Sequence, residues 1–225
     1  MNNELIKRIL TSLCLIILLV LVFSYSYILI ISLIIISIIT WIEFNVLISR
    51  ILKKNISKNR VLKIFIKAFA LLYLTVFSTY IFQGITQIEP NFTLEMIYLF
   101  SICICSDIGG LVFGKIFKGK KLTKISPNKT ISGSIGSFIL SLMLVPIFYF
   151  LDQSNNPYNL IILAIIVSFV CQLGDLFISY LKRKAKVKDT GDLLPGHGGV
   201  LDRIDGILFA LPIGMITLNF LTSVI

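Results

Sequence analysis

Residues 27–48 read YILIISLIIISIITWIEFNVLI, an apolar run of 22 residues. About 20 apolar residues are enough for a helix to cross the hydrocarbon core of a bilayer. Further runs of this kind follow one another along the chain, and the first of them is somewhat short. They are Ile9–Phe23, Ile64–Phe82, Leu94–Phe117, Ile131–Leu151, Asn159–Leu181 and Gly206–Ile225. The sequence therefore predicts an all-α fold, a polytopic transmembrane bundle of about seven helices.

The composition agrees with an integral membrane protein. The 225 residues are 56% hydrophobic, and the mean hydropathy is +0.95, which is too apolar for a soluble domain. No small-residue cleavage site follows the first run, so we expect it to be retained as a helix. We expect a single membrane domain over residues 1–225, with N-terminal helices in 1–93 and catalytic helices and loops in 94–225.

The distribution of the 21 Lys and Arg residues predicts the orientation of the chain. If seven helices alternate in direction, every Lys and Arg falls on one side of the membrane. The loops on the opposite side carry only the acids Glu89, Glu95 and Asp152. Since basic loops stay in the cytoplasm, we expect a cytoplasmic N-terminus and an external C-terminus. The net charge of +10 is then a topology signal that also attracts anionic membrane lipid, and no nucleic-acid partner is expected.

Two acids, Asp107 and Asp175, stand inside apolar runs near their cytoplasmic ends. An acid at membrane depth is costly, so it marks a functional site by default. The alternative is that each acid simply pairs with a nearby Lys or polar side chain. Helical spacing around Asp175 also predicts a polar stripe that faces protein or a wet cleft. The stripe consists of Ser168, Gln172, Asp175, Ser179 and Lys182.

The long polar segment near the end of the chain reads SYLKRKAKVKDTGDLLPGHGGVLDRID over residues 179–205. Asp202 and Asp205 are three residues apart, which places both carboxylates on one face of a helix. Together with Asp175 they predict a Mg²⁺ site, because Mg²⁺ prefers one or two carboxylates with substrate phosphates and water. A second cation is left open. The alternative for the pair is a simple cap of a helix N-terminus.

The same segment contains a glycine-rich loop with the only histidine of the chain. Gly198 and Gly199 allow close approach of the backbone, whose N–H groups bind phosphate well. His197 is expected either to meet a leaving pyrophosphate or to order the loop. Four nearby cations are candidate phosphate partners, although each is equally explained as a solvated charge: Lys182, Arg183, Lys188 and Arg203.

These motifs resemble the phosphatidate cytidylyltransferases, also called CDP-diacylglycerol synthases. The resemblance rests on Ser-x-x-Lys-Arg from Ser179, Lys188-Asp189, and the run from Leu194 to Asp205. An upstream block, Asp107-Ile108-Gly109 followed by Ser126-Pro127-Asn128-Lys129-Thr130, is also similar to the family. The chain departs from the family pattern at Ile131-Ser132, where Trp-Glu is usual, and at Ile178, where Glu is common.

The resemblance implies an enzyme that makes CDP-diacylglycerol and pyrophosphate from CTP and phosphatidate in phospholipid biosynthesis. It implies a Mg²⁺-dependent site on the cytoplasmic side of a bacterial inner membrane, and a homodimer. We assign catalysis to Asp175, Asp202, Asp205, His197, Lys188 and Asp189. We assign nucleotide and lipid-phosphate binding to Asp107, Ser126, Lys129, Lys182, Arg183, Gly198, Gly199 and Arg203. The expected metal ligands are Asp175, Asp202 and Asp205.

Other functions were weighed against this one. A CDP-alcohol phosphotransferase would need Ala-Arg where Phe209-Ala210 stands, and further aspartates that the chain lacks after Asp205. A CTP-dependent polyprenol kinase, or a cytidylyltransferase for another lipid phosphate, is harder to separate by sequence. A transporter or channel would have charges spread through the membrane depth, whereas here both intramembrane acids lie near one side.

Overall fold

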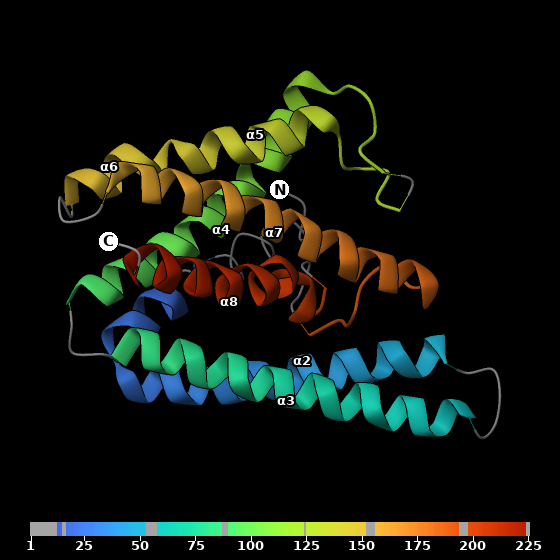
Figure 1. Cartoon of the computed structure of the whole chain (residues 1–225). Helices are drawn as coiled ribbons and strands as arrows, with labels where there is room; N and C mark the ends of the chain where they lie inside the picture. Colours follow the sequence, from blue (N-terminus) through green and yellow to red (C-terminus); the bar gives the residue numbers. More distant parts are fainter. Residues whose placement is uncertain are drawn as a thin grey trace. The chain divides into compact units, whose positions relative to one another are not determined.

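The computed structural model describes residues 13–14, 17–52, 58–86, 90–123, 125–151, 156–193 and 198–223. Over these residues the chain is mostly helical, and an isolated β-bridge pairs Lys121 with Thr130 in the loop after α4. The named helices are α2 (Ser26–Ile51), α3 (Lys58–Thr86), α4 (Pro90–Phe117), α5 (Ile131–Leu142), α6 (Leu144–Leu151), α7 (Pro157–Lys184) and α8 (Leu201–Ser223) (Figure 1).

The prediction of an all-α transmembrane fold is confirmed. Six segments of the described chain are long and apolar enough to cross a membrane, and α5 and α6 together form one of them. The predicted first run, Ile9–Phe23, falls partly outside the described residues, although residues 17–24 are helical. The orientation of the N-terminus stays a prediction.

The chain forms two compact units, and each is discontinuous in sequence. One unit, here called the loop unit, contains residues 1–86 and 181–204. The other, here called the crossing unit, contains residues 87–180 and 205–225. Helices α7 and α8 therefore each contribute to both units. The division of the domain at residue 93 stays a prediction.

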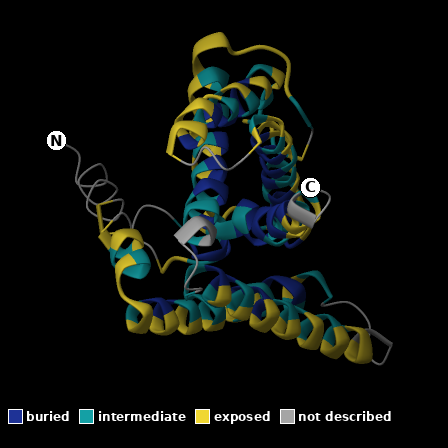
Figure 2. Cartoon of the chain, turned by 60° about the vertical axis from the view of Figure 1, so that its left-hand side comes forward, coloured by how far each residue is buried: buried dark blue, intermediate teal, exposed yellow. Residues whose placement is uncertain are grey.

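In the loop unit, α2 and α3 lie side by side (Figure 1). Two polar contacts join them within the apolar surface: the Ser37 and Ser78 hydroxyls are 2.7 Å apart, and Trp41 Nε1 donates to the Lys67 carbonyl at 3.2 Å. Exposed residues run along both helices (Figure 2), and many of them are large apolar side chains. This surface suits contact with lipid chains.

In the crossing unit, α4 and α5 pack with their backbones close together because small residues line the contact. A Cβ atom on Gly109 would lie 2.4 Å from the Gly136 carbonyl oxygen, and one on Gly133 would lie 2.7 Å from the Gly110 carbonyl oxygen. Ser137 also donates to the Ser106 carbonyl at 2.6 Å. Such small-residue contacts are typical of helix packing in membranes.

Two helix ends have clear causes in the sequence. The break between α5 and α6 falls at Met143, because Pro146 has no N–H to donate to Leu142 and its ring clashes with that carbonyl. At the end of α7, Lys186 has a φ of 58°, and Val187 N–H donates to the Lys182 carbonyl at 3.0 Å. This Schellman-type ending turns the chain out of α7 and into the loop that precedes α8.

Candidate functional site

The loop between α7 and α8 is held by the carboxylate of Asp202, in the first turn of α8. Asp202 Oδ1 lies 2.7 Å from the Lys182 ammonium, and both side chains are largely buried, at 3% and 12% exposure. Asp202 Oδ2 accepts from the backbone N–H of Thr190 at 2.8 Å and of Gly199 at 3.1 Å. Gly199 lies two residues before the start of α8, so this bond ties the end of the loop to the first turn of the helix.

A second carboxylate, Glu43 in the middle of α2, holds the same loop within the loop unit. Its oxygens accept from Thr190 Oγ1 at 2.8 Å, from Val200 N–H at 3.0 Å and from Leu201 N–H at 2.9 Å. Glu43 is buried, with 7% exposure. A negative charge at the first amides of α8 is stabilised by the helix dipole as well as by these bonds.

The glycines of the loop make room for these two acids. A Cβ atom on Gly199 would lie 2.4 Å from Glu43 Oε2, and one on Gly191 would lie 2.8 Å from Glu43 Oε1. Gly198 has a φ of +81°, and a Cβ there would lie 3.0 Å from Asp202 Oδ2. The structure thus gives these glycines a role in packing around carboxylates, and the predicted role of Gly198 and Gly199 in phosphate binding stays a prediction.

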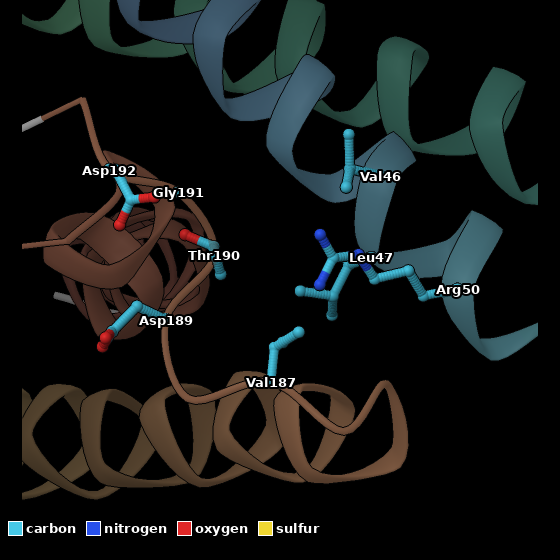
Figure 3. A pocket seen from close by; sticks show the side chains of 8 residues that line it. All are labelled: Val46, Leu47, Arg50, Val187, Asp189, Thr190, Gly191 and Asp192. Atoms are coloured by element: carbon cyan, nitrogen blue, oxygen red, sulfur yellow. The ribbon is translucent and has the colours of Figure 1, made fainter.

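A cavity of about 140 Å³ lies between the end of α2 and this loop. Figure 3 shows the Arg50 side chain reaching from α2 across the space toward the loop, while the Asp189 carboxylate points away from it. The lining residues are Val46, Leu47, Arg50, Val187, Asp189, Thr190, Gly191 and Asp192. Arg50 also lines a more open groove on α2 and α3, together with Asn45, Ser49 and Lys67.

The crossing unit holds a separate group of acids where α7 and α8 meet. A Cβ on Gly174 would lie 2.9 Å from the Asp205 carbonyl oxygen, so the two backbones touch beside Asp175 and Asp205. Asp175 forms an ion pair with Lys129 and accepts from Ser179 Oγ at 3.3 Å. Asp205 is buried, with 7% exposure, and its Oδ1 accepts from Gly206 N–H at 2.9 Å.

Asp107 of α4 lies close to this crossing. Cys171 Sγ approaches Asp107 Oδ1 at 3.9 Å, and a Cβ on Gly206 would lie 2.5 Å from the same sulfur atom. The structure therefore brings α4, α7 and α8 together around Cys171. The expectation that Asp107 and Asp175 share one pocket stays a prediction.

The polar stripe predicted on α7 makes contacts with protein along its length. Within the crossing unit, Ser168 Oγ lies 3.0 Å from Ser106 Oγ, and Gln172 accepts from Ser134. Within the loop unit, Lys182 binds Asp202. The prediction that this face of the helix meets protein is confirmed.

The other predicted site residues lie on the surface or outside the described chain. Arg183, Lys188, Asp189 and Arg203 are exposed. Ser126 is in the loop after α4, where its carbonyl accepts from Lys129 N–H at 3.1 Å. His197 lies outside the described residues, so its predicted role is not tested. Among the residues that are described, no three His, Cys, Asp or Glu side chains form a ready metal site.

Two residues of this region were missed by the sequence reasoning. Glu43 is an acid inside an apolar run, and the rule that singled out Asp107 and Asp175 applies to it equally. By its sequence context Arg50 is only one of the basic charges that predict the topology. No sequence signal connects either residue with the loop, which lies 147 residues after Glu43 at its first contact.

Comparison with known proteins identifies the family to which this chain belongs. The model of the cytidylyltransferase family matches residues 2–221. A phosphatidate cytidylyltransferase of Staphylococcus haemolyticus is 46% identical over 121 residues, which cover 52% of this chain and 46% of that protein. One from Bacillus subtilis is 38% identical over 148 residues, covering 62% of this chain and 55% of the relative. One from Rickettsia typhi is 41% identical over 133 residues, covering 56% and 58%.

The match thus spans about half the length of these curated relatives. The family model, in contrast, extends from the first residues to the last turns of α8. It includes α2 with Glu43 as well as the acids of α7 and α8. On this evidence the chain belongs to the cytidylyltransferase family.

Proposed function

We propose that this chain transfers the cytidylyl group of CTP to phosphatidate, which gives CDP-diacylglycerol and pyrophosphate. The observation that carries the proposal is the family match over residues 2–221. The names of the relatives supply the lipid substrate. The pairing of a carboxylate with a lysine within each unit, Asp175 with Lys129 and Asp202 with Lys182, supports the same chemistry, because phosphate groups need cations and metal ligands close together.

The reaction needs little covalent chemistry from the protein. An oxygen of the phosphatidate phosphate attacks the α-phosphorus of CTP, and a new P–O bond forms there. The bond from the α-phosphorus to the β-phosphate bridging oxygen breaks, and its electron pair leaves with pyrophosphate. The protein's task is to align the two phosphates and to balance charge. Lys129 and Lys182, with the exposed Arg183, Lys188 and Arg203, are the side chains proposed for this task.

The carboxylates fit a magnesium ion by their donor chemistry. Asp175 and Asp205 supply oxygen ligands from two helices whose backbones touch at Gly174, and Mg²⁺ needs only one or two carboxylates beside phosphates and water. Asp202 is proposed as a third ligand, although its two oxygens already accept from Lys182 and the loop. When bound, Mg²⁺ would neutralise negative charge on the reacting phosphates.

We further propose that the protein is a homodimer in a bacterial inner membrane, with its site on the cytoplasmic side. The relatives are bacterial, and six segments of the described residues are suited to cross a membrane. The basic loops follow α2, α4 and α7, which share one side if successive spans alternate. That side is cytoplasmic by the positive-inside rule.

The test is an assay of the purified chain with Mg²⁺, phosphatidate and CTP that carries a label on either the α- or the γ-phosphate. Transfer of the α-label to lipid with release of pyrophosphate is the expected result, and chelation of Mg²⁺ is expected to stop it. Transfer of the γ-label instead would show a lipid kinase. Absence of both labels from lipid would overturn the proposal.

A further inference from the structure

Glu43 is an ionisable residue that the proposed chemistry does not use. It lies in the apolar helix α2, and only 7% of it is exposed. A buried carboxylate is costly unless its oxygens accept hydrogen bonds. Glu43 meets this condition with partners from a single distant segment, Thr190, Val200 and Leu201.

The loop is shaped to receive this carboxylate. Gly191 and Gly199 approach it so closely that a Cβ on either residue would lie within 2.8 Å of a Glu43 oxygen. Any side chain at these two positions would displace the carboxylate or the loop. The contact is therefore built from both sides, by the acid on α2 and by two glycines in the loop.

Thr190 connects Glu43 with Asp202. Its hydroxyl donates to Glu43 at 2.8 Å, and its backbone N–H donates to Asp202 at 2.8 Å. Thr190 is itself buried, with 8% exposure. Two carboxylates from different helices thus fix one residue, which directly follows the predicted catalytic pair Lys188 and Asp189.

Thr190 also lines the cavity beside it, so its position affects the shape of that cavity. Thr190 and Gly191 form the wall opposite Val46, Leu47 and Arg50 of α2 (Figure 3). Its volume of about 140 Å³ is below the range of about 300–1,000 Å³ that is common for whole ligands. It is therefore too small for a whole nucleotide, and Arg50 would offer a guanidinium donor to a part of one that enters it.

We propose that Glu43 is a positioning residue for the nucleotide: it holds Thr190, Val200 and Leu201 in the conformation that forms this cavity and presents Lys188 to CTP. The inference rests on the proposed function for the identity of the nucleotide. Glu43 acts through the loop and does not touch the substrates. Its loss should therefore weaken the use of CTP more than the use of phosphatidate.

The test compares Glu43→Gln with Thr40→Val in the full-length protein. Gln keeps the size of the side chain, but it removes the charge and places an NH₂ group against N–H donors. Thr40 is a matched control, because it is buried on the same helix, at 2% exposure, and its hydroxyl has no partner among the described residues. We expect Glu43→Gln to lower kcat/KM for CTP by about ten-fold or more, mainly through KM, as expected for the loss of charge-assisted hydrogen bonds. KM for phosphatidate should stay close to wild type, and Thr40→Val should change neither constant.

Amide hydrogen exchange of residues 198–202 supplies a readout that needs no substrate. The N–H groups of Val200 and Leu201 should exchange faster in Glu43→Gln than in wild type, and unchanged exchange would overturn the proposal.

The proposal also fails if Glu43→Gln only lowers yield and thermal stability, with kcat and both KM values of the folded protein unchanged. If Glu43→Gln does not fold, Thr190→Val removes one of the three bonds and should raise KM for CTP in the same direction. A wild-type protein that labels no lipid overturns the proposed function, whereas the exchange result decides separately whether Glu43 holds the loop.

Discussion

The ammonium of Lys182 lies 2.7 Å from Asp202 Oδ1, and so joins the last turn of α7 to the first turn of α8. The loop between these turns carries Thr190 and Gly199, whose N–H groups bind the other oxygen of Asp202. One carboxylate therefore closes the loop at its base through a charge and two amides. The two residues therefore differ in their number of partners: among these contacts Lys182 has one and Asp202 has three.

Removal of the Lys182 charge should destabilise the protein strongly. In Lys182→Met, Asp202 stays buried without its counter-charge, a situation that typically costs about 3–5 kcal/mol. The double variant Lys182→Met, Asp202→Asn should recover part of this loss, because no lone charge remains buried. Thermal unfolding in detergent, with CTP-dependent labelling of lipid in parallel, measures both effects. A single variant as stable as wild type would show that the pair does not hold the loop.

Asp175→Asn should abolish lipid labelling while leaving the protein folded. Its ion pair with Lys129 is about a quarter exposed on both sides, at 29% and 26%, and partly exposed pairs contribute only about 0–1 kcal/mol. Expression and Tm should therefore stay near wild type. Labelled CTP, phosphatidate and Mg²⁺ give the activity readout, and Asp205→Asn should behave alike in this assay. Activity retained in either variant would contradict their assignment as metal ligands.

The contact between α7 and α8 should not tolerate a side chain at Gly174. A methyl group there would lie 2.9 Å from the Asp205 carbonyl and 2.8 Å from the Phe209 ring, so the helices must separate. We expect Gly174→Ala to lose about 1–3 kcal/mol of stability and most of the activity, as overpacked sites do. Gly214→Ala is the control on α8, because its nearest neighbours would be side-chain ends of Leu99 and Val167 and not backbone. Equal effects of the two substitutions on Tm and labelling would argue against a special role of the crossing.

Arg50→Ala tests the cavity beside the loop. If the cavity receives part of CTP, loss of the guanidinium should raise KM for CTP several-fold and leave the stability within about 0.5 kcal/mol, since Arg50 is exposed. Lys63→Ala, another basic residue near the start of α3, is a control for general charge effects. A rise in KM for phosphatidate alone would instead place the lipid in the groove that Arg50 shares with Lys67.

Much of the fold could be predicted because a membrane imposes a simple rule on length and polarity. The expected run Tyr27–Ile48 is the helix Ser26–Ile51, and the expected run Ile131–Leu151 is the helix pair α5 and α6. The break at Met143 follows from Pro146, yet apolar composition alone does not show it. The start of α8 differs from the expected run Gly206–Ile225, since the helix begins at Leu201 and so includes Asp202 and Asp205.

The site could be predicted only in part because its contacts join distant segments. The pairing of Asp175 with Lys129 was one alternative for an intramembrane acid, and the structure shows it. Asp202 lies in the first turn of α8, which is the position that the alternative of a helix N-terminal acid requires. Glycines at 191 and 199 reveal nothing by themselves, because their use depends on a carboxylate more than 140 residues earlier in the chain.

The bond between Glu43 and the start of α8 has a consequence for the order in which the protein is made. Synthesis runs from the N-terminus, so α2 enters the membrane with its acid long before Val200 and Leu201 leave the ribosome, 157 and 158 residues later. During that interval Glu43 lacks its final partners, and an acid in a membrane helix is costly. A nascent chain that stops before residue 190 should therefore keep α2 poorly inserted or bound by a chaperone. The synthesis of α8 is then also the step at which α2 reaches its final place in the membrane.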